Sequence, residues 1–249
     1  MTHDEFSQAL KAEIHRHDGM NELELFGKHL SSRPLTKHEL RIFLATTGAF
    51  FREIPGGILA LGLRVTDDWI TRDRFHAVSK GATVLYSAVD EFGLSDPRGI
   101  GGSHHELFLS MTQHWGFGAE ELTDPDCILD EGELLAIATS EFYRRRPIPE
   151  ALGFHVASEL SSNREFVLCE EGFQRFPESY GLRGSDDPVL TFYHVHTLVE
   201  PMHGSTSLDG AGIYFEDNPA TMAAIMTGAV AFLKPYGRLF RALNRAFYG

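Results

Sequence analysis

The chain has 249 residues, of which 43% are hydrophobic, enough to bury one sizeable core. Its formal net charge of −13 at pH 7 argues against nucleic acids and anionic membranes as partners, because both require a basic surface. Two cysteines, Cys127 and Cys169, are too few for a disulfide framework, so we expect a reducing cytoplasm. No signal peptide or membrane-spanning stretch is apparent.

Helical patterning dominates the chain, and sustained alternation with a period of two is scarce, which predicts an all-α protein. Thr36, with Glu39 three positions later, is an N-terminal capping signal, and Pro55-Gly56-Gly57 predicts a helix break. In chain order, the predicted helices span residues 5–15, 22–30, 36–54, 68–90, 104–115, 130–143, 149–176, 189–202 and 218–235.

The predicted loops are short or polar. Residues 93–102 are rich in glycine, and residues 180–188 are polar. The chain contains no internal repeat and no linker, so we expect one domain over residues 1–249, built as a bundle of roughly seven or eight helices. Residues 1–20 are a candidate for a peripheral N-terminal segment.

The most informative motif is His196-x-x-x-Glu200-x-x-His203. At about 100° per residue these three side chains share one stripe of a helix. Two imidazoles and a carboxylate that face one way form half of a metal site, although a polar helix face that merely carries histidines has the same pattern. Pro201 follows Glu200 directly, so we expect a kink that makes Glu200 the least regular member of the stripe.

Three further residues are candidate partners of this stripe. Glu91 ends a predicted helix, where the macrodipole disfavours an acidic side chain, so either a solvated helix end or a ligand role explains it. His104 and His105 compete for a role at the start of the next helix. Glu159 is predicted to face the core of its helix, and a buried carboxylate needs a partner such as a metal ion.

Several common catalytic motifs are missing from the sequence. There is no His-Glu-x-x-His zinc signature, no phosphate-binding loop and no Gly-x-Ser-x-Gly elbow. Ferritin-like di-iron proteins need two Glu-x-x-His pairs, whereas this chain has Glu200-x-x-His203 and only Asp73-x-x-His76 as an imitation. A different helical scaffold is therefore required.

The order of the motifs resembles that of the haem-oxygenase-like di-iron oxidases and oxygenases. The sequence Asp90-Glu91-Phe92-Gly93 is followed by His104-x-Glu106-Leu107-Phe108, a helical Glu159 and the motif at 196–203, and segment 35–44 looks like that superfamily's second helical element. The likeness extends from about residue 22 onwards. The stretch between the first two motifs is longer than in the family, and Glu200 stands where Asp is commoner.

The resemblance implies a seven-helix bundle that holds two Fe(II) ions per chain and no haem. It implies that Glu91, Glu159 and Glu200 are catalytic carboxylates. The ligand set that it implies is Glu91, His104, Glu159, His196, Glu200 and His203.

The resemblance also implies an enzyme that activates O₂ and oxidises a small, amino-acid-derived substrate in biosynthesis, by N-oxygenation, desaturation or oxidative C–C cleavage. Phe192, Tyr193 and Met202 are candidates for lining its pocket, although core packing explains them equally well, and we expect a homodimer without nucleic-acid or membrane partners. Two alternatives stay open. One is a metal-independent enzyme on the same fold, like thiaminase II or the cofactor-free quinone-forming oxidases. The other is a non-enzymatic metal-binding protein.

Overall fold

The computed structural model describes residues 2–94, 102–184 and 187–249. Within these ranges the chain forms α-helices joined by turns and short 3-10 segments, without a strand, so the predicted all-α class is confirmed. Residues 95–101 and 185–186, which belong to the two predicted loops, lie outside the described residues.

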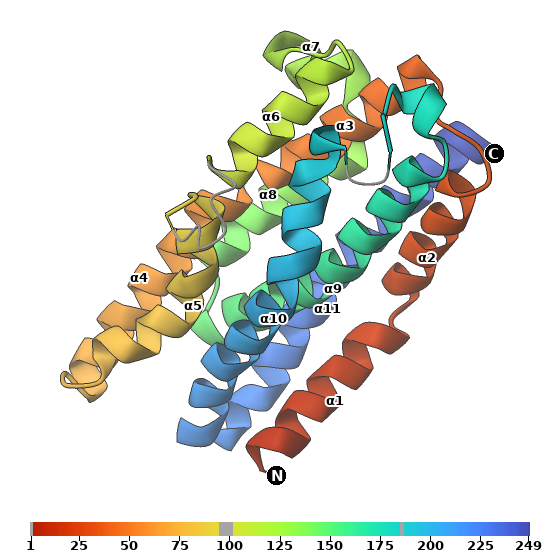
Figure 1. Ribbon diagram of the computed structural model, residues 1–249. Helices are drawn as coiled ribbons and strands as arrows, with labels where there is room; N and C mark the ends of the chain where they lie inside the picture. The colour runs from red at the N-terminus through yellow and green to blue at the C-terminus, as the bar shows by residue number, and fades with distance from the viewer. Residues whose placement is uncertain (1, 95–101, 185–186) are drawn as a thin grey trace.

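The helices alternate with short connections along the chain (Figure 1). The α-helices are α1 (His3–Arg16), α2 (Asp18–Leu30), α3 (Lys37–Phe51), α4 (Ile54–Arg72), α5 (Ala77–Glu91), α6 (His104–His114), α7 (Ala119–Thr123), α8 (Asp130–Arg144), α9 (Ile148–Gln174), α10 (Thr191–Asp217) and α11 (Met222–Tyr248). The 3-10 segments are Pro125–Cys127, Pro177–Tyr180, Pro188–Leu190 and Pro219–Thr221.

Two predicted boundaries in the first half are wrong. The break expected at 55–57 lies earlier, between α3 and α4, because Pro55 occupies the first turn of α4, where its missing N–H leaves no helical bond unmade. The single helix expected over 68–90 is two helices, α4 and α5. The Asp73 carboxylate accepts hydrogen bonds from the backbone N–H groups of Phe75 and His76 between them, which stabilises the turn.

Two helices in the second half are longer than predicted. We expected them to end near 202 and 235, but α10 and α11 continue through Pro201 and Pro235. Beyond Pro201, buried residues such as Leu208 and Ala211 keep α10 packed against the core. The stability gained from tertiary packing therefore offsets the loss of the backbone hydrogen bond that each proline removes.

The N-terminal segment, a candidate for a peripheral position, contributes to the core. Phe6, Leu10 and Ile14 of α1 are each 0% exposed. A capping box between Thr2 and Glu5 starts this helix, which packs against α9, α10 and α11. The apolar core is thus one cluster that extends from Phe6 to Phe247.

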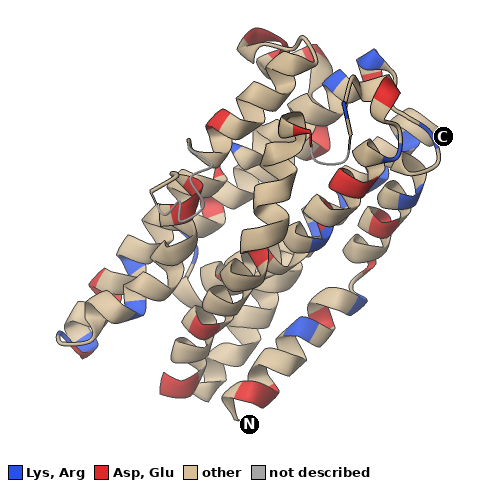
Figure 2. Ribbon diagram, in the orientation of Figure 1, with Lys and Arg blue, Asp and Glu red and all other residues tan. Residues whose placement is uncertain are grey.

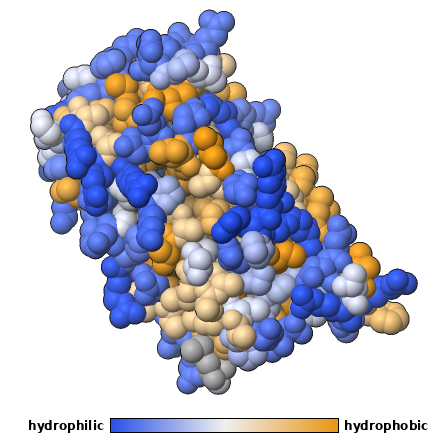
Figure 3. Space-filling model, turned by 180° about the vertical axis from the view of Figure 1, so that it is seen from behind, coloured by the Kyte–Doolittle hydropathy of each residue, from blue (hydrophilic) through white to orange (hydrophobic). Residues whose placement is uncertain are grey.

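Helix α9 lies at the centre of the bundle and packs against α2, α8, α10 and α11. The α4–α5 pair lies on one side of this centre, and α1 and α2 lie on the other (Figure 1). Acidic and basic residues are interspersed along the helices (Figure 2). From behind, apolar side chains appear as several groups between polar ones (Figure 3). No helix in the described ranges is long and apolar enough to cross a membrane.

Candidate metal centre

The six side chains implicated by sequence come together inside the bundle. Helix α5 supplies one at its last residue, α6 supplies one at its first, α9 supplies one, and α10 supplies three. All six are buried, with at most 9% of any residue exposed. They form two groups, each with its donor atoms within 4.8 Å of one another: Glu91, His104 and His196 in the first cluster, and Glu159, Glu200 and His203 in the second cluster.

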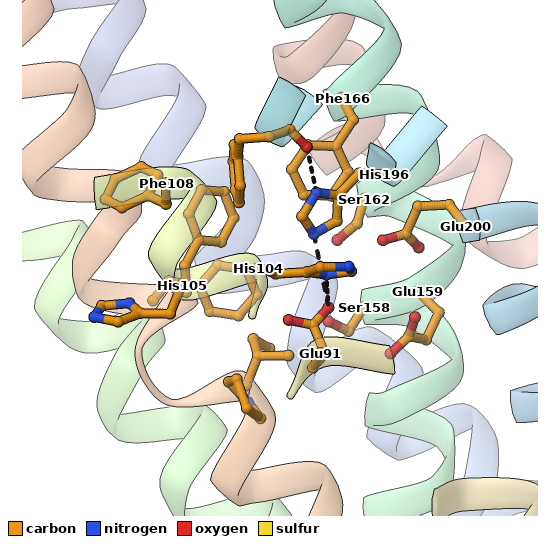
Figure 4. A pocket seen from close by; sticks show the side chains of 15 residues that line it. Glu91, His104, His105, Phe108, Ser158, Glu159, Ser162, Phe166, His196 and Glu200 are labelled. Atoms are coloured by element: carbon orange, nitrogen blue, oxygen red, sulfur yellow. Dashed lines mark hydrogen bonds and ion pairs between the residues drawn. The ribbon is translucent and has the colours of Figure 1, made fainter. Parts of the chain in front are cut away.

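The first cluster is centred on the Glu91 carboxylate (Figure 4). Its Oε1 atom lies 3.0 Å from His104 Nδ1 and 3.7 Å from His196 Nε2. His196 Nδ1 lies 2.7 Å from the Phe192 carbonyl oxygen, which only accepts, so Nδ1 carries the ring proton and donates it. The unprotonated Nε2 is therefore available to a metal on the side of Glu91.

The second cluster has the opposite nitrogen turned inward. His203 Nε2 donates to Asp90 Oδ2 at 3.0 Å, while His203 Nδ1 lies 3.4 Å from Glu159 Oε2 and 3.9 Å from Glu200 Oε1. A carboxylate behind a histidine commonly orients metal-binding imidazoles. The sequence did not reveal this role of Asp90, because adjacent helical residues point about 100° apart and only the fold shows where each points.

The clustered charges perturb one another strongly. Burial alone would raise the pKa of Glu91, but His104 and His196 hold it well below the usual range. Burial and the neighbouring Glu159 carboxylate instead raise the pKa of Glu200 well above its usual range. Burial would lower the pKa of His203, yet its bonds to Asp90 and Glu159 raise it to about 11. Carboxylates packed this closely require positive charge between them.

Three buried ligand atoms at the site, His104 Nδ1, His203 Nδ1 and Glu200 Oε2, form no hydrogen bond of good geometry within the described part of the chain, although the two nitrogens lie 3.0 and 3.4 Å from the carboxylates of Glu91 and Glu159. Such orphaned atoms are rare in native interiors, and each costs about 1–3 kcal/mol. They belong to the two clusters, where a metal ion would satisfy them. Imidazole and carboxylate together suit a first-row transition metal, so the residues fit a pair of iron ions.

Local backbone signals place His104 beside Glu91. Ser103 and Glu106 form a capping box that starts α6 at His104, and the Ser-x-x-Glu spacing is visible in the sequence. Gly93 ends α5 with a φ of 69°, and a Cβ there would overlap the Gly102 backbone. The two ends of the connection between α5 and α6 therefore lie side by side. The adjacent His105 is exposed and belongs to neither cluster, so the structure brings His104 rather than His105 to the site.

Pro201 does not displace Glu200, a question that the sequence left open. Helix α10 is continuous across the proline, and Pro201 itself lies on the exposed face. Glu200 stays in the stripe, 3% exposed, and joins the second cluster. The missing N–H of Pro201 falls on the solvent side of the helix, so it leaves the ligand side undisturbed.

A pocket opens onto both clusters (Figure 4). Phe192 lines it, whereas Tyr193 is buried in the core, which was the alternative interpretation, and Met202 is 53% exposed and does not line the pocket. Apart from the cluster residues, its walls are Phe50, Phe51, Ile54, Pro55, His105, Phe108, Ser158, Ser162, Phe166 and Phe192.

Comparison with known proteins agrees with this geometry. Residues 71–237, more than half of the chain, match the sequence model of a family described as iron-containing redox enzymes. No curated protein matches the chain significantly.

Two solved structures share its fold. A CADD-like protein of unknown function from Nostoc punctiforme has a TM-score of 0.74 at 13% identity, with 99% of each chain covered. A domain of unknown function with a haem-oxygenase-like fold from Shewanella denitrificans has a TM-score of 0.59 at 12% identity, with 98% of this chain and 90% of that chain covered. The chain therefore has the haem-oxygenase-like fold and belongs to the family of iron-containing redox enzymes.

Proposed function

We propose that this protein is a non-haem di-iron oxidase or oxygenase that uses O₂ to oxidise a small, amino-acid-derived substrate. The observation that carries the proposal is the pair of buried clusters, which contain three ligand atoms that form no hydrogen bond of good geometry in the described ranges. The iron-containing redox family supports the choice of metal. We assign two Fe(II) ions per chain and a role in biosynthesis as part of this proposal.

Two Fe(II) ions, when bound, would supply electrons for the reduction of O₂. The protein's own groups hold the site in place. Glu91, Glu159 and Glu200, which we propose as the catalytic carboxylates, offset the positive charge of the metal pair. Asp90 and the Phe192 carbonyl fix the rings of His203 and His196 through the nitrogen that faces away from each cluster.

The pocket suits a small molecule whose reacting carbon or nitrogen lies against the clusters. Phenylalanine side chains such as Phe108 and Phe192 exclude water from its walls, so the reaction is shielded from solvent. Ser158 and Ser162 add hydroxyl groups on the α9 side, where they can hydrogen-bond a polar substituent. Orientation by a few polar groups in an apolar pocket is typical of small-molecule sites.

Anaerobic iron loading tests the proposal. We expect about two Fe(II) per wild-type chain, and we expect His196→Ala and Glu159→Ala each to lose at least one, because each removes a donor from a different cluster. His105→Ala, beside the site but outside both clusters, should keep two. Unchanged iron content in both cluster variants would refute the di-iron assignment.

Oxygen consumption by the loaded protein separates the remaining alternatives. Iron binding without O₂ uptake in the presence of candidate amino-acid-derived substrates would favour a metal-binding protein that is not an enzyme. A chain that binds no iron would favour a metal-independent enzyme on the same fold.

A further inference from the structure

Behind Glu159 lies a buried polar pair that the proposed metal centre does not use. His155 of α9 and Tyr143 of α8 are both 0% exposed. The Tyr143 hydroxyl oxygen lies 3.2 Å from His155 Nδ1, and the same nitrogen lies 3.3 Å from Glu159 Oε1. His155 and Glu159 are one helical turn apart, so this nitrogen lies between a phenol and a candidate ligand.

The surroundings of His155 decide which ring nitrogen carries the proton. His155 Nε2 is buried and has no hydrogen-bond partner among the described residues. A proton there would be a buried donor without an acceptor, which is costly. On Nδ1 the proton faces two oxygens, and Glu159 Oε1 is one of them. Glu159 Oε2 then remains on the side of His203, at 3.4 Å from its Nδ1.

Tyr143 is held rigidly in this arrangement. Helix α4 passes so close to its ring that a Cβ at Gly57 would overlap it. The rings of Tyr143 and His155 meet edge to face, with centroids 5.7 Å apart. The phenol therefore supports the His155 ring at the same nitrogen that faces Glu159, through the hydroxyl contact, and along the ring through the edge-to-face contact.

We infer that His155 and Tyr143 are positioning residues that hold Glu159 with Oε1 engaged by His155 and Oε2 presented to the second cluster. This inference rests on the proposed di-iron function. Neither residue touches the substrate pocket, so neither is catalytic. Loss of such a support typically lowers metal affinity about 10–100-fold.

The test is an anaerobic Co(II) titration of the full chain after removal of metal. The variants are made in a His104→Ala background, which disables the first cluster and leaves the second to be measured alone. We expect His155→Leu to weaken Co(II) binding about 10–100-fold by calorimetry and to shift the visible Co(II) bands. His155→Asn should restore most of the affinity, because its amide nitrogen occupies the place of Nδ1. Tyr143→Phe should cause a smaller loss in the same direction.

Tyr193→Phe is the matched control. Tyr193 is a buried tyrosine whose hydroxyl has no hydrogen-bond partner in the described ranges, so its removal should leave Co(II) affinity unchanged. Circular dichroism of the metal-free variants checks their folding. If His155→Leu does not fold, the Co(II) affinities of Tyr143→Phe and His155→Asn test the inference in its place. Affinities of all folded variants within about twofold of the parent would overturn the inference. Absence of Co(II) binding by the wild-type chain would instead overturn the proposed function and the inference together.

Discussion

At the residue scale, the site depends on which nitrogen each imidazole presents. His196 donates through Nδ1 to a carbonyl oxygen, and His203 donates through Nε2 to Asp90, so opposite nitrogens face the two clusters. The spacing of the motif predicts that both rings lie on one stripe. The spacing does not show which groups lie behind the rings. Asp90 belongs to another helix, and the contact with the Phe192 carbonyl depends on how the His196 ring is rotated.

Glu165 is a second buried carboxylate on α9, away from the two clusters. It is 2% exposed, and its Oε2 accepts a hydrogen bond of 2.8 Å from the Tyr236 hydroxyl. Burial raises its pKa to about 7, and the bond from Tyr236 only partly opposes this. In the unfolded chain the carboxyl has its ordinary pKa of 4.5, so the folded state binds the proton more tightly.

We predict that this carboxyl makes the free energy of unfolding depend on pH. Its contribution is fully present below pH 4.5 and is lost as pH rises through about 7. The stability of wild type relative to Glu165→Gln should fall by up to about 3 kcal/mol across this window, as measured by urea denaturation at a series of pH values. The exposed Glu178→Gln serves as control. Parallel pH profiles for wild type and Glu165→Gln would contradict the prediction.

At the element scale, α9 and α11 approach each other through reciprocal glycines. A Cβ at Gly153 would overlap the Ile225 carbonyl, and a Cβ at Gly228 would overlap the Glu150 carbonyl. The obstacles are backbone atoms, which cannot rotate away as a flexible side chain can. The helix that carries Glu159 is thereby fixed closely against its neighbour in the core.

We expect Gly153→Ala to lower the free energy of unfolding by about 1–3 kcal/mol, because the two helices must separate to admit the methyl group. Gly228→Ala should have a similar effect. The double variant should lose less than the sum, because the first methyl already separates the helices. Gly184→Ala, where a Cβ meets nothing within 4 Å, is the control in urea denaturation. A Gly153→Ala protein as stable as this control would refute the close approach.

At the scale of the whole molecule, the two clusters join four helices. The α5–α6 pair and the α9–α10 pair are separated along the chain by α7 and α8 and meet at the site. Several large apolar side chains, including Leu63 and Ile137, are exposed on the surface. The homodimer, the cytoplasmic location and the small-molecule partner stay predictions.

Metal loading should stabilise the whole fold. Ions that bind only the folded chain at about 100 times their Kd add about 2.7 kcal/mol per site, which raises the Tm of a chain of this size by several degrees. Anaerobic calorimetry with Fe(II) and then with a chelator measures the shift. Glu200→Ala should reduce it, because the second cluster loses a ligand. Equal Tm values with and without iron would show that the clusters do not bind the metal.

The sequence by itself determined the helical class, the capping signal at Thr36 and the stripe of His196, Glu200 and His203, because periodicity and spacing are local properties, whereas the full set of six side chains came from the resemblance to a known family. The helix ends predicted at prolines and near Asp73 were wrong, because tertiary packing and the hydrogen bonds of a turn determine where those helices end.

Only the tertiary structure divided the six side chains into two clusters, placed His104 rather than His105 at the site, and brought Asp90, His155 and Tyr143 behind the ligands. The physical reason is that these contacts join different helices or depend on the rotation of a side chain. Neither is encoded by spacing along a single helix.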